Sequence, residues 1–178
     1  MGRSRYKIHE EHYPYFITSS IIDYLPLFTF PEVADVILEV LTFLQEKRDV
    51  KLYAYVIMEN HIHFILEGNN LKKKLRLSKS FAANRIINVL KNRGKSKILD
   101  RLKWSKLKHK KHIIHQVWAE GLHPIQLTSV EMVNQKMEYI HMNPVKRGYV
   151  YLPEHWRYSS ARDYLGGDGL IPITLFGG

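Results

Sequence analysis

Residues 53–67, YAYVIMENHIHFILE, contain two runs rich in β-branched and aromatic residues, separated by Glu59 and Asn60. Runs of this composition on either side of a short polar connection predict two strands joined by a turn. Successive side chains of a strand point to opposite faces, so His61 and His63 project together. The apolar side chains at positions 62, 64 and 66 then lie on the other face of the sheet. We therefore expect two imidazoles side by side in the middle of a sheet.

The flanking segments complete an alternating pattern of strands and helices. Strands are expected at residues 15–22, 50–58, 61–67 and 113–121, and helices at 30–49, 71–94 and 128–142. In the last helix, Thr128 and Glu131 form a capping-box pattern and Pro144 is the expected stop. The order predicts one α+β domain over residues 1–178, with a ferredoxin-like, RRM-like antiparallel sheet. Two helices are expected on one face of that sheet, followed by a C-terminal helix that carries Tyr139.

The composition excludes several classes of protein. The chain has 178 residues and no cysteine, which excludes disulfides, thiolate zinc sites and a cysteine nucleophile. It has no apolar run approaching the roughly 18 residues of a membrane span. The first residues lack the hydrophobic core of a signal peptide, so we expect no secretion and no membrane association. The expected location is the cytoplasm.

Positive charge is concentrated in the middle of the chain. Residues 71–112 hold 16 lysines and arginines against one acid, Asp100, which leaves 11 basic and 16 acidic residues elsewhere. A solvated lysine-rich helix face is the simpler explanation for a short run of this kind. Over 42 residues, however, such a bias is typical of a surface that binds a polyanion. We therefore expect a basic helical segment at 71–112 and a nucleic-acid partner.

The His61 and His63 pair has two interpretations. Two imidazoles at this spacing can chelate one divalent ion, with further ligands completing the shell. They can also be hydrogen-bonded histidines on a polar sheet face. A shuffled chain with ten histidines in 178 residues holds about 0.5 such pairs, so the spacing alone decides nothing. The position of the pair in mid-sheet, just before the basic segment, favours a functional site.

A polar stripe runs along the last predicted helix. Gln135, Tyr139 and Asn143 recur at intervals of four residues and share one face. The simpler interpretation is a tyrosine hydroxyl that anchors a packed ring. Attack by a phenol on phosphorus becomes plausible where a metal neutralises the developing charge, and His61 and His63 could hold that metal. Asn143 could then supply a third oxygen ligand, with Gln135 as the alternative.

These features together resemble the REP-associated tyrosine transposases, an IS200-like family within the HUH superfamily of single-strand nucleases. The family carries His-hydrophobe-His on a strand, matched by HIH at 61–63, and a tyrosine helix that runs into Asn-Pro, matched by EYIHMNPVKRG at 138–148. YVIMENHIHFIL, VWAEGLHP and WRYSSARDYLGG extend the similarity over nearly the whole chain.

The resemblance implies a metal-dependent transposase that cleaves and rejoins single-stranded DNA, often folded as a hairpin. It implies Tyr139 as the nucleophile, a 5′-phosphotyrosine intermediate, and Mg²⁺ or Mn²⁺ held by His61 and His63. Asn143 matches the position one helical turn after the family's tyrosine, where related enzymes usually carry glutamine. Both monomeric and homodimeric arrangements fit the resemblance.

The expected phosphate contacts come mainly from the basic segment and the start of the chain: Arg3, Arg5, Lys72, Lys73, Lys74, Arg76, Lys79 and Arg85. Four aromatic residues are candidates for stacking on unpaired bases or for the core: Tyr53, Tyr55, Trp104 and Trp118. A minor alternative is a zinc site that includes His112 and His115.

Two other hypotheses remain open. The chain could be a hairpin-binding protein, for DNA or RNA, that descends from such an enzyme and no longer cuts. It could also be a relaxase or replication initiator of the same superfamily, with similar chemistry.

Overall fold

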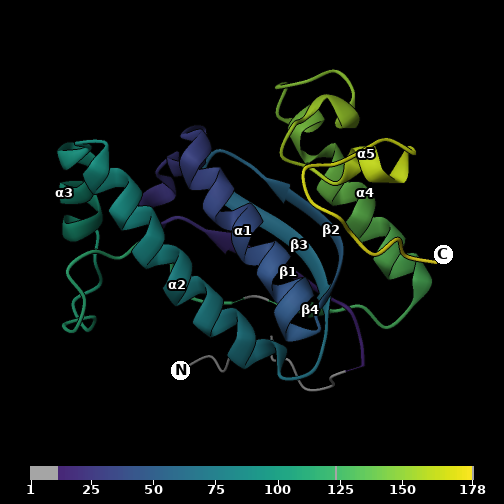
Figure 1. The fold of residues 1–178 in the computed structure, drawn as a ribbon, viewed down its shortest axis with the longest axis horizontal. Coiled ribbons are helices and arrows are strands. Elements are labelled where there is room, and N and C mark those ends of the chain that lie inside the picture. The colour runs from purple at the N-terminus through teal and green to yellow at the C-terminus, as the bar shows by residue number, and fades with distance from the viewer. Residues whose placement is uncertain (1–11, 123, 178) are drawn as a thin grey trace.

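A computed structural model describes residues 12–122 and 124–177 (Figure 1). Its strands are β1 (Tyr15–Ser20), β2 (Lys51–Ile57), β3 (His61–Glu67) and β4 (Ile125–Gln126). The helices are α1 (Pro31–Arg48), α2 (Leu71–Asn92), α3 (Ser96–Trp104), α4 (Val130–Lys146) and α5 (Ala161–Tyr164), with short 3₁₀ turns at Ile22–Tyr24, Leu27–Thr29 and Pro153–His155. None of the helices in the described residues is long and apolar enough to cross a membrane.

The sheet has the strand order β2-β3-β1-β4, and every adjacent pair is antiparallel. Strands β2 and β3 form the hairpin predicted around Glu59 and Asn60, and Met58 N–H donates to the His61 carbonyl at 2.8 Å. Helix α1 connects β1 to β2, which leaves β3 between those two strands. This split βαβ topology confirms the predicted ferredoxin-like α+β fold.

Helices α1 and α2 pack on one face of the sheet (Figure 1). The predicted apolar stripe of α1 faces inward, because Val33, Val36 and Leu41 are all buried. The stripe meets the apolar side chains of β3, including Phe64 and Leu66, in one core. The segment that precedes α1 and the C-terminal tail contribute the edges of this core.

Helix α4 covers the opposite face of the sheet. Met137 and Ile140 of α4 pack with Phe16 of β1, Val56 of β2 and Ile65 of β3 in a second core. Since β3 alternates, Ile65 and the two histidines project toward α4, while Phe64 projects toward α1 and α2. The tyrosine-bearing helix therefore lies on the side to which His61 and His63 point.

Three local predictions were wrong. The expected strand at 113–121 forms only an isolated bridge between Ile21 and Trp118, and the fourth strand is the two-residue β4. The N-cap of α4 is Ser129, whose hydroxyl accepts from Met132 N–H at 3.3 Å, rather than Thr128. Helix α4 also continues past Pro144 to Lys146. A proline removes only its own N–H bond, and here Arg147 N–H still reaches the Asn143 carbonyl at 3.1 Å.

Candidate active site between strand β3 and helix α4

His61 and His63 are buried side by side on β3, with 8% and 5% of their surfaces exposed. Their ring centroids lie 4.8 Å apart and the ring planes meet at 74°. The structure thus brings the two imidazoles together on the α4 face of the sheet, as the alternation of the strand predicted.

A hydrogen bond orients each histidine ring. The Nδ1 atom of His63 lies 2.8 Å from Thr18 Oγ1 on the adjacent strand β1. The Nδ1 atom of His61 lies 2.7 Å from Asn60 Oδ1, which can only accept, so this nitrogen carries the proton. The Nε2 lone pair of His61 is then left free. In His63, Nε2 is buried and has no hydrogen-bond partner among the described residues.

Both histidines are neutral at neutral pH. Burial, with smaller contributions from the nearby His61, Lys136 and Arg147, lowers the pKa of His63 to about 3. Burial also lowers the pKa of His61, against a smaller opposing effect from Glu59. A neutral imidazole whose Nδ1 is held by a second group is the form in which histidine binds metals.

Tyr139 projects from α4 to the edge of the histidine pair. Its ring centroid is 5.3 Å from that of His63 and 5.8 Å from that of Phe16, in edge-to-face geometry. Tyr139 has 39% of its surface exposed, so a substrate can reach the side chain from solvent. The site therefore combines buried nitrogen donors with an accessible phenol.

Positive charge surrounds this tyrosine. The ammonium groups of Lys136 and Lys146 lie 5.7 Å and 6.0 Å from the centroid of its ring. Arg147 lies nearby and pairs with Glu59 at 3.3 Å. Fixed cations around a nucleophile favour the approach of a phosphate group and stabilise charge that develops on it.

The two candidates for the third ligand lie in different environments. Asn143, one turn after Tyr139, is buried with 8% exposure, whereas Gln135, one turn before it, is exposed. A buried amide is better placed to act within a site than one in solvent. The assignment of Asn143 stays a prediction, but Gln135 is the weaker candidate.

The donor set fits a divalent ion that keeps open positions. The described residues contain no group of three His, Cys, Asp or Glu side chains that could hold a metal. His61 and His63 would therefore supply two nitrogens, and the other positions would fall to an amide oxygen, water or the substrate. The buried, unpartnered Nε2 of His63 is the structural feature that such an ion would satisfy. His112 and His115 likewise belong to no such group among the described residues, so the structure does not support a zinc site there.

The predicted DNA contacts do not gather at Tyr139. Arg3 and Arg5 lie outside the described residues. The apolar side of α2 packs on the face of the sheet away from α4. All the predicted contacts in the described part of the chain are on this helix: Lys72, Lys73, Lys74, Arg76, Lys79 and Arg85.

These six cations differ in how free they are. Lys72, Lys73 and Arg76 are exposed to solvent. By contrast, the Lys74 ammonium donates to the Arg48 carbonyl, and Arg85 pairs with Glu39 at 3.3 Å. Lys79 is partly buried. We therefore expect the first three to contribute most to general attraction of a polyanion.

Of the four candidate aromatic residues, only Trp104 is available for stacking, with 83% exposure. Tyr53, Tyr55 and Trp118 are buried at 6%, 0% and 9% exposure and belong to the cores, so their ring faces are covered by protein. The strand positions of Tyr53 and Tyr55 were compatible with base stacking and with core packing. Because helices and loops pack on both faces of the sheet, both tyrosines belong to the cores.

The sequence did not reveal the residues that support the site. Thr18 contacts His63 because strands β1 and β3 pair, and no local sequence pattern predicts that pairing. Asn60 could have been found as the neighbour of His61 in the turn. Lys136 lies three residues before Tyr139 on the same helix, so the helical spacing was a usable signal.

No family model and no curated protein matches the chain. Among solved structures, a REP-associated tyrosine transposase bound to a REP hairpin aligns with a TM-score of 0.62 and 19% identity, covering 100% of this chain and 93% of that one. A protein of Deinococcus radiodurans R1 described as a transposase aligns with a TM-score of 0.46 and 17% identity, covering 79% of this chain and 95% of the other. A TM-score of 0.62 over the full chain means that the two folds are alike, whereas a score below 0.5 carries no such meaning. The resemblance predicted from the motifs is therefore confirmed at the level of the fold.

Proposed function

We propose that this chain is a metal-dependent DNA strand transferase that cleaves and rejoins single-stranded DNA at hairpin sequences. Tyr139 is the nucleophile, and a 5′-phosphotyrosine links protein and DNA between the two steps. His61 and His63 hold Mg²⁺ or Mn²⁺, with Asn143 as the third protein ligand. The reaction is a transposase or endonuclease reaction of the HUH type.

One observation carries this proposal. His63 is neutral, its buried Nε2 has no hydrogen-bond partner among the described residues, and its ring lies 5.3 Å from that of the accessible Tyr139. A buried polar nitrogen without a partner costs stability unless a ligand satisfies it. A phenol beside a metal-competent histidine pair, among lysines, suits attack on a phosphodiester better than attack on a neutral substrate.

In the first step the Tyr139 hydroxyl oxygen bonds to phosphorus, and the bond from phosphorus to the 3′-oxygen breaks. The phenol loses its proton to solvent and the departing 3′-oxygen takes one up, which yields a free 3′-hydroxyl. Lys136 and Lys146 attract and stabilise the charged phosphate. In the second step a DNA 3′-hydroxyl attacks the phosphotyrosine and releases the phenol, so no external energy source is needed.

Thr18 and Asn60 have a positioning role. Each holds one histidine through Nδ1, which directs Nε2 away from the hydrogen-bonded side of the ring. The metal, when bound, would polarise the scissile phosphate and neutralise the charge that develops on it.

The testing experiment mixes purified protein with labelled hairpin DNA from around its own gene, with and without manganese, and runs a denaturing gel. We expect a metal-dependent labelled band at the mass of the protein, lost in Tyr139→Phe and after addition of a chelator. Tyr149→Phe is the matched control, because Tyr149 is also exposed and follows α4 but has no role in the proposed reaction. That variant should retain the adduct.

An adduct that persists in Tyr139→Phe would overturn the assignment of the nucleophile. Tight binding of hairpins with no cutting or attachment under any metal condition would instead favour the non-catalytic binding protein. DNA and RNA hairpins compared in the same assay separate the two forms of that alternative.

A further inference from the structure

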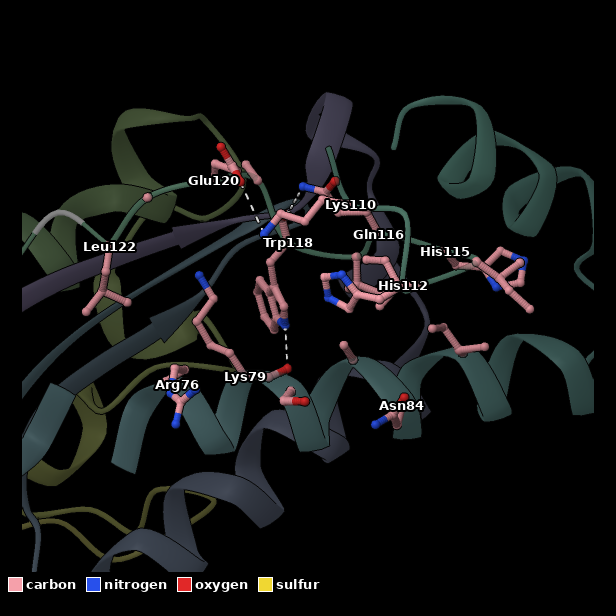
Figure 2. A pocket seen from close by; sticks show the side chains of 18 of the residues that line it. Arg76, Lys79, Asn84, Lys110, His112, His115, Gln116, Trp118, Glu120 and Leu122 are labelled. Carbon is pink, nitrogen blue, oxygen red and sulfur yellow. Dashed lines mark hydrogen bonds and ion pairs between the residues drawn. The ribbon is translucent and has the colours of Figure 1, made fainter. Parts of the chain in front are cut away.

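A cleft of about 720 Å³ lies between α2 and the segment 110–122 (Figure 2). This segment follows α3 and runs back along α2. The two walls of the cleft therefore come from stretches that are distant in sequence. Polar and cationic side chains line it, including Lys72, Arg76, Lys79, Lys110, His112 and Gln116. Its apolar lining includes Ala83, Ile87, Ile113 and Val117.

Lys79 is fixed at the centre of this cleft by Trp118. The Lys79 ammonium lies 5.2 Å from the centroid of the indole ring, and the indole N–H donates to the Lys79 carbonyl at 2.9 Å. Figure 2 shows Trp118 pointing from the loop toward α2, with this hydrogen bond as a dashed line. Trp118 is therefore a positioning residue for the lysine and not a free stacking surface.

The cleft contains a cation, Lys79, that no acid in the described part of the chain balances. Among the described residues Lys79 forms no ion pair, and the acid that lines the cleft, Glu120, is bound by His109 at 2.8 Å and Lys110 at 3.1 Å. Burial and the charge of Lys110 lower the pKa of Lys79 to about 8, so the amine is still mainly protonated at neutral pH. A partly buried ammonium without a partner is costly, and an anionic ligand would remove that cost.

The cleft is connected to the histidine site through the sheet. Ile22 N–H donates to the Val117 carbonyl at 2.9 Å, and Ala119 N–H donates to the Ser20 carbonyl at 2.9 Å. Ser20 is the direct partner of His61 on β3. With neighbouring strands about 4.8 Å apart, the backbone of Ala119 lies roughly 10 Å from that of His61. Because the His61 ring projects to the α4 face, a strand of nucleic acid that contacts both places passes around the edge of the sheet.

We propose that this cleft binds an unpaired segment of the DNA substrate, with a phosphate at the Lys79 ammonium and a base along the wall of Ala83 and Ile87. The proposal rests on the proposed function, since it assigns where the single strand lies outside the site of cleavage. The volume is in the range that encloses a drug-sized molecule, roughly 300–1,000 Å³. It suits one or two unstacked nucleotides, whereas a duplex keeps its bases stacked inside and offers only phosphates.

The test measures binding of tetrathymidylate, without metal, to the full chain and to two charge-removing variants. Lys79→Met should weaken binding about tenfold, because a charge-assisted contact is lost from a partly buried site. Lys47→Met is the matched control, since Lys47 lies on the neighbouring helix α1, is exposed, does not line the cleft and is not among the expected phosphate contacts. That variant should bind within about twofold of the unaltered protein.

Chemical protection provides a measurement that does not depend on a variant folding. The unaltered protein is acetylated on lysine with and without tetrathymidylate, and the rate at each lysine is read by mass spectrometry. We expect the oligonucleotide to slow acetylation of Lys79 strongly and that of Lys47 little. Equal protection of both lysines, no protection of Lys79, or equal protection by a blunt duplex would each overturn the proposal. Protection by tetrauridylate alone would overturn the assignment to DNA.

Failure of this inference is distinguishable from failure of the proposed function. A covalent adduct at Tyr139 together with an unprotected Lys79 would leave the chemistry intact and remove the cleft as a binding site. Protection of Lys79 without any adduct would retain the cleft and remove the chemistry.

Discussion

His63 and Lys79 are two desolvated side chains on opposite faces of the same sheet. The first is neutral and suited to bind a cation, whereas the second is charged and suited to bind an anion. His63 faces α4, and its pKa is lowered to about 3, mainly by burial, so it is a neutral base whose buried Nε2 has no hydrogen-bond partner among the described residues. Lys79 lies in the cleft beside α2, and its pKa of about 8 leaves it a cation.

The difference shows how similar burial can prepare two different ligands. An imidazole loses its proton when desolvated and becomes a donor to a metal ion. An ammonium starts from a much higher pKa, so a comparable downward shift leaves it charged and in need of an anion. The fold therefore places a neutral nitrogen base on one side of the sheet and a partly buried cation on the other.

The largest expected effect comes from removing the lone pair on the α4 face. His63→Gln should reduce metal-dependent cleavage by at least about a thousandfold, because several kcal/mol of charge stabilisation are lost. Single-turnover cleavage of the hairpin substrate in manganese measures this. The matched control is His141→Gln, a partly buried histidine of α4 that contacts Ser160 and Tyr164 instead of the site. Equal losses in the two variants would contradict the assignment.

The next effect concerns the residue that holds Lys79. Trp118→Ala should lower the free energy of unfolding by about 3 kcal/mol, since a buried indole is replaced by a cavity. Urea unfolding followed by circular dichroism provides the measurement. Trp104→Ala is the control and should change stability by less than about 0.5 kcal/mol, because Trp104 is 83% exposed. Similar losses at both positions would mean that Trp118 is not part of the core.

A smaller effect depends on pH and concerns the buried histidines on the α4 side of the sheet. The folded-state pKa values of His63 and His141 are lowered to about 3 and about 4, mainly by burial, so the unfolded chain takes up these protons first. Stability should therefore fall as the pH drops below about 6.5, and each histidine should contribute about 2 kcal/mol of that loss between about pH 7 and pH 5. Urea unfolding at both pH values tests this. His141→Gln should reduce the loss by about 2 kcal/mol, and an unchanged pH dependence in that variant would contradict the burial of the ring.

The smallest effect sharpens the distinction between free and paired cations on α2. Arg76→Gln should reduce the slope of log binding constant against log salt concentration by roughly 0.7 to 0.9, because one phosphate contact is lost. Arg85→Gln should change the slope less, since Arg85 is already paired with Glu39. Binding of single-stranded DNA measured across a salt series distinguishes them, and the reverse order of effects would show that the ion pair opens on binding.

Much of the local structure could be predicted from the sequence because it follows from periodicity. The period of two in β3 placed His61 and His63 on one face, and the spacing of Val33, Val36 and Leu41 identified the buried side of α1. The helical spacing likewise put Tyr139 and Asn143 one turn apart. These relations hold within a single element, where backbone geometry alone determines which side chains are neighbours.

Relations between elements could not be predicted in this way. Segment 113–121 has the composition of a strand, yet it forms one bridge beyond the end of β1 and lines the cleft instead. Tyr55 and Trp118 were candidates for base stacking, but helices and loops cover them. The hydrogen bond between Thr18 and His63 exists only because β1 pairs with β3 in one register.

By itself, then, the sequence determined the type of fold, the histidine pair, the tyrosine helix and the basic segment. Tertiary structure alone decided that α4 covers the histidine face and that the basic residues of α2 lie away from Tyr139. It also decided that Lys79 meets Trp118 and has no acidic partner among the described residues. The physical reason is that periodicity fixes side chains relative to their own backbone, whereas burial of two separate apolar faces brings distant segments together.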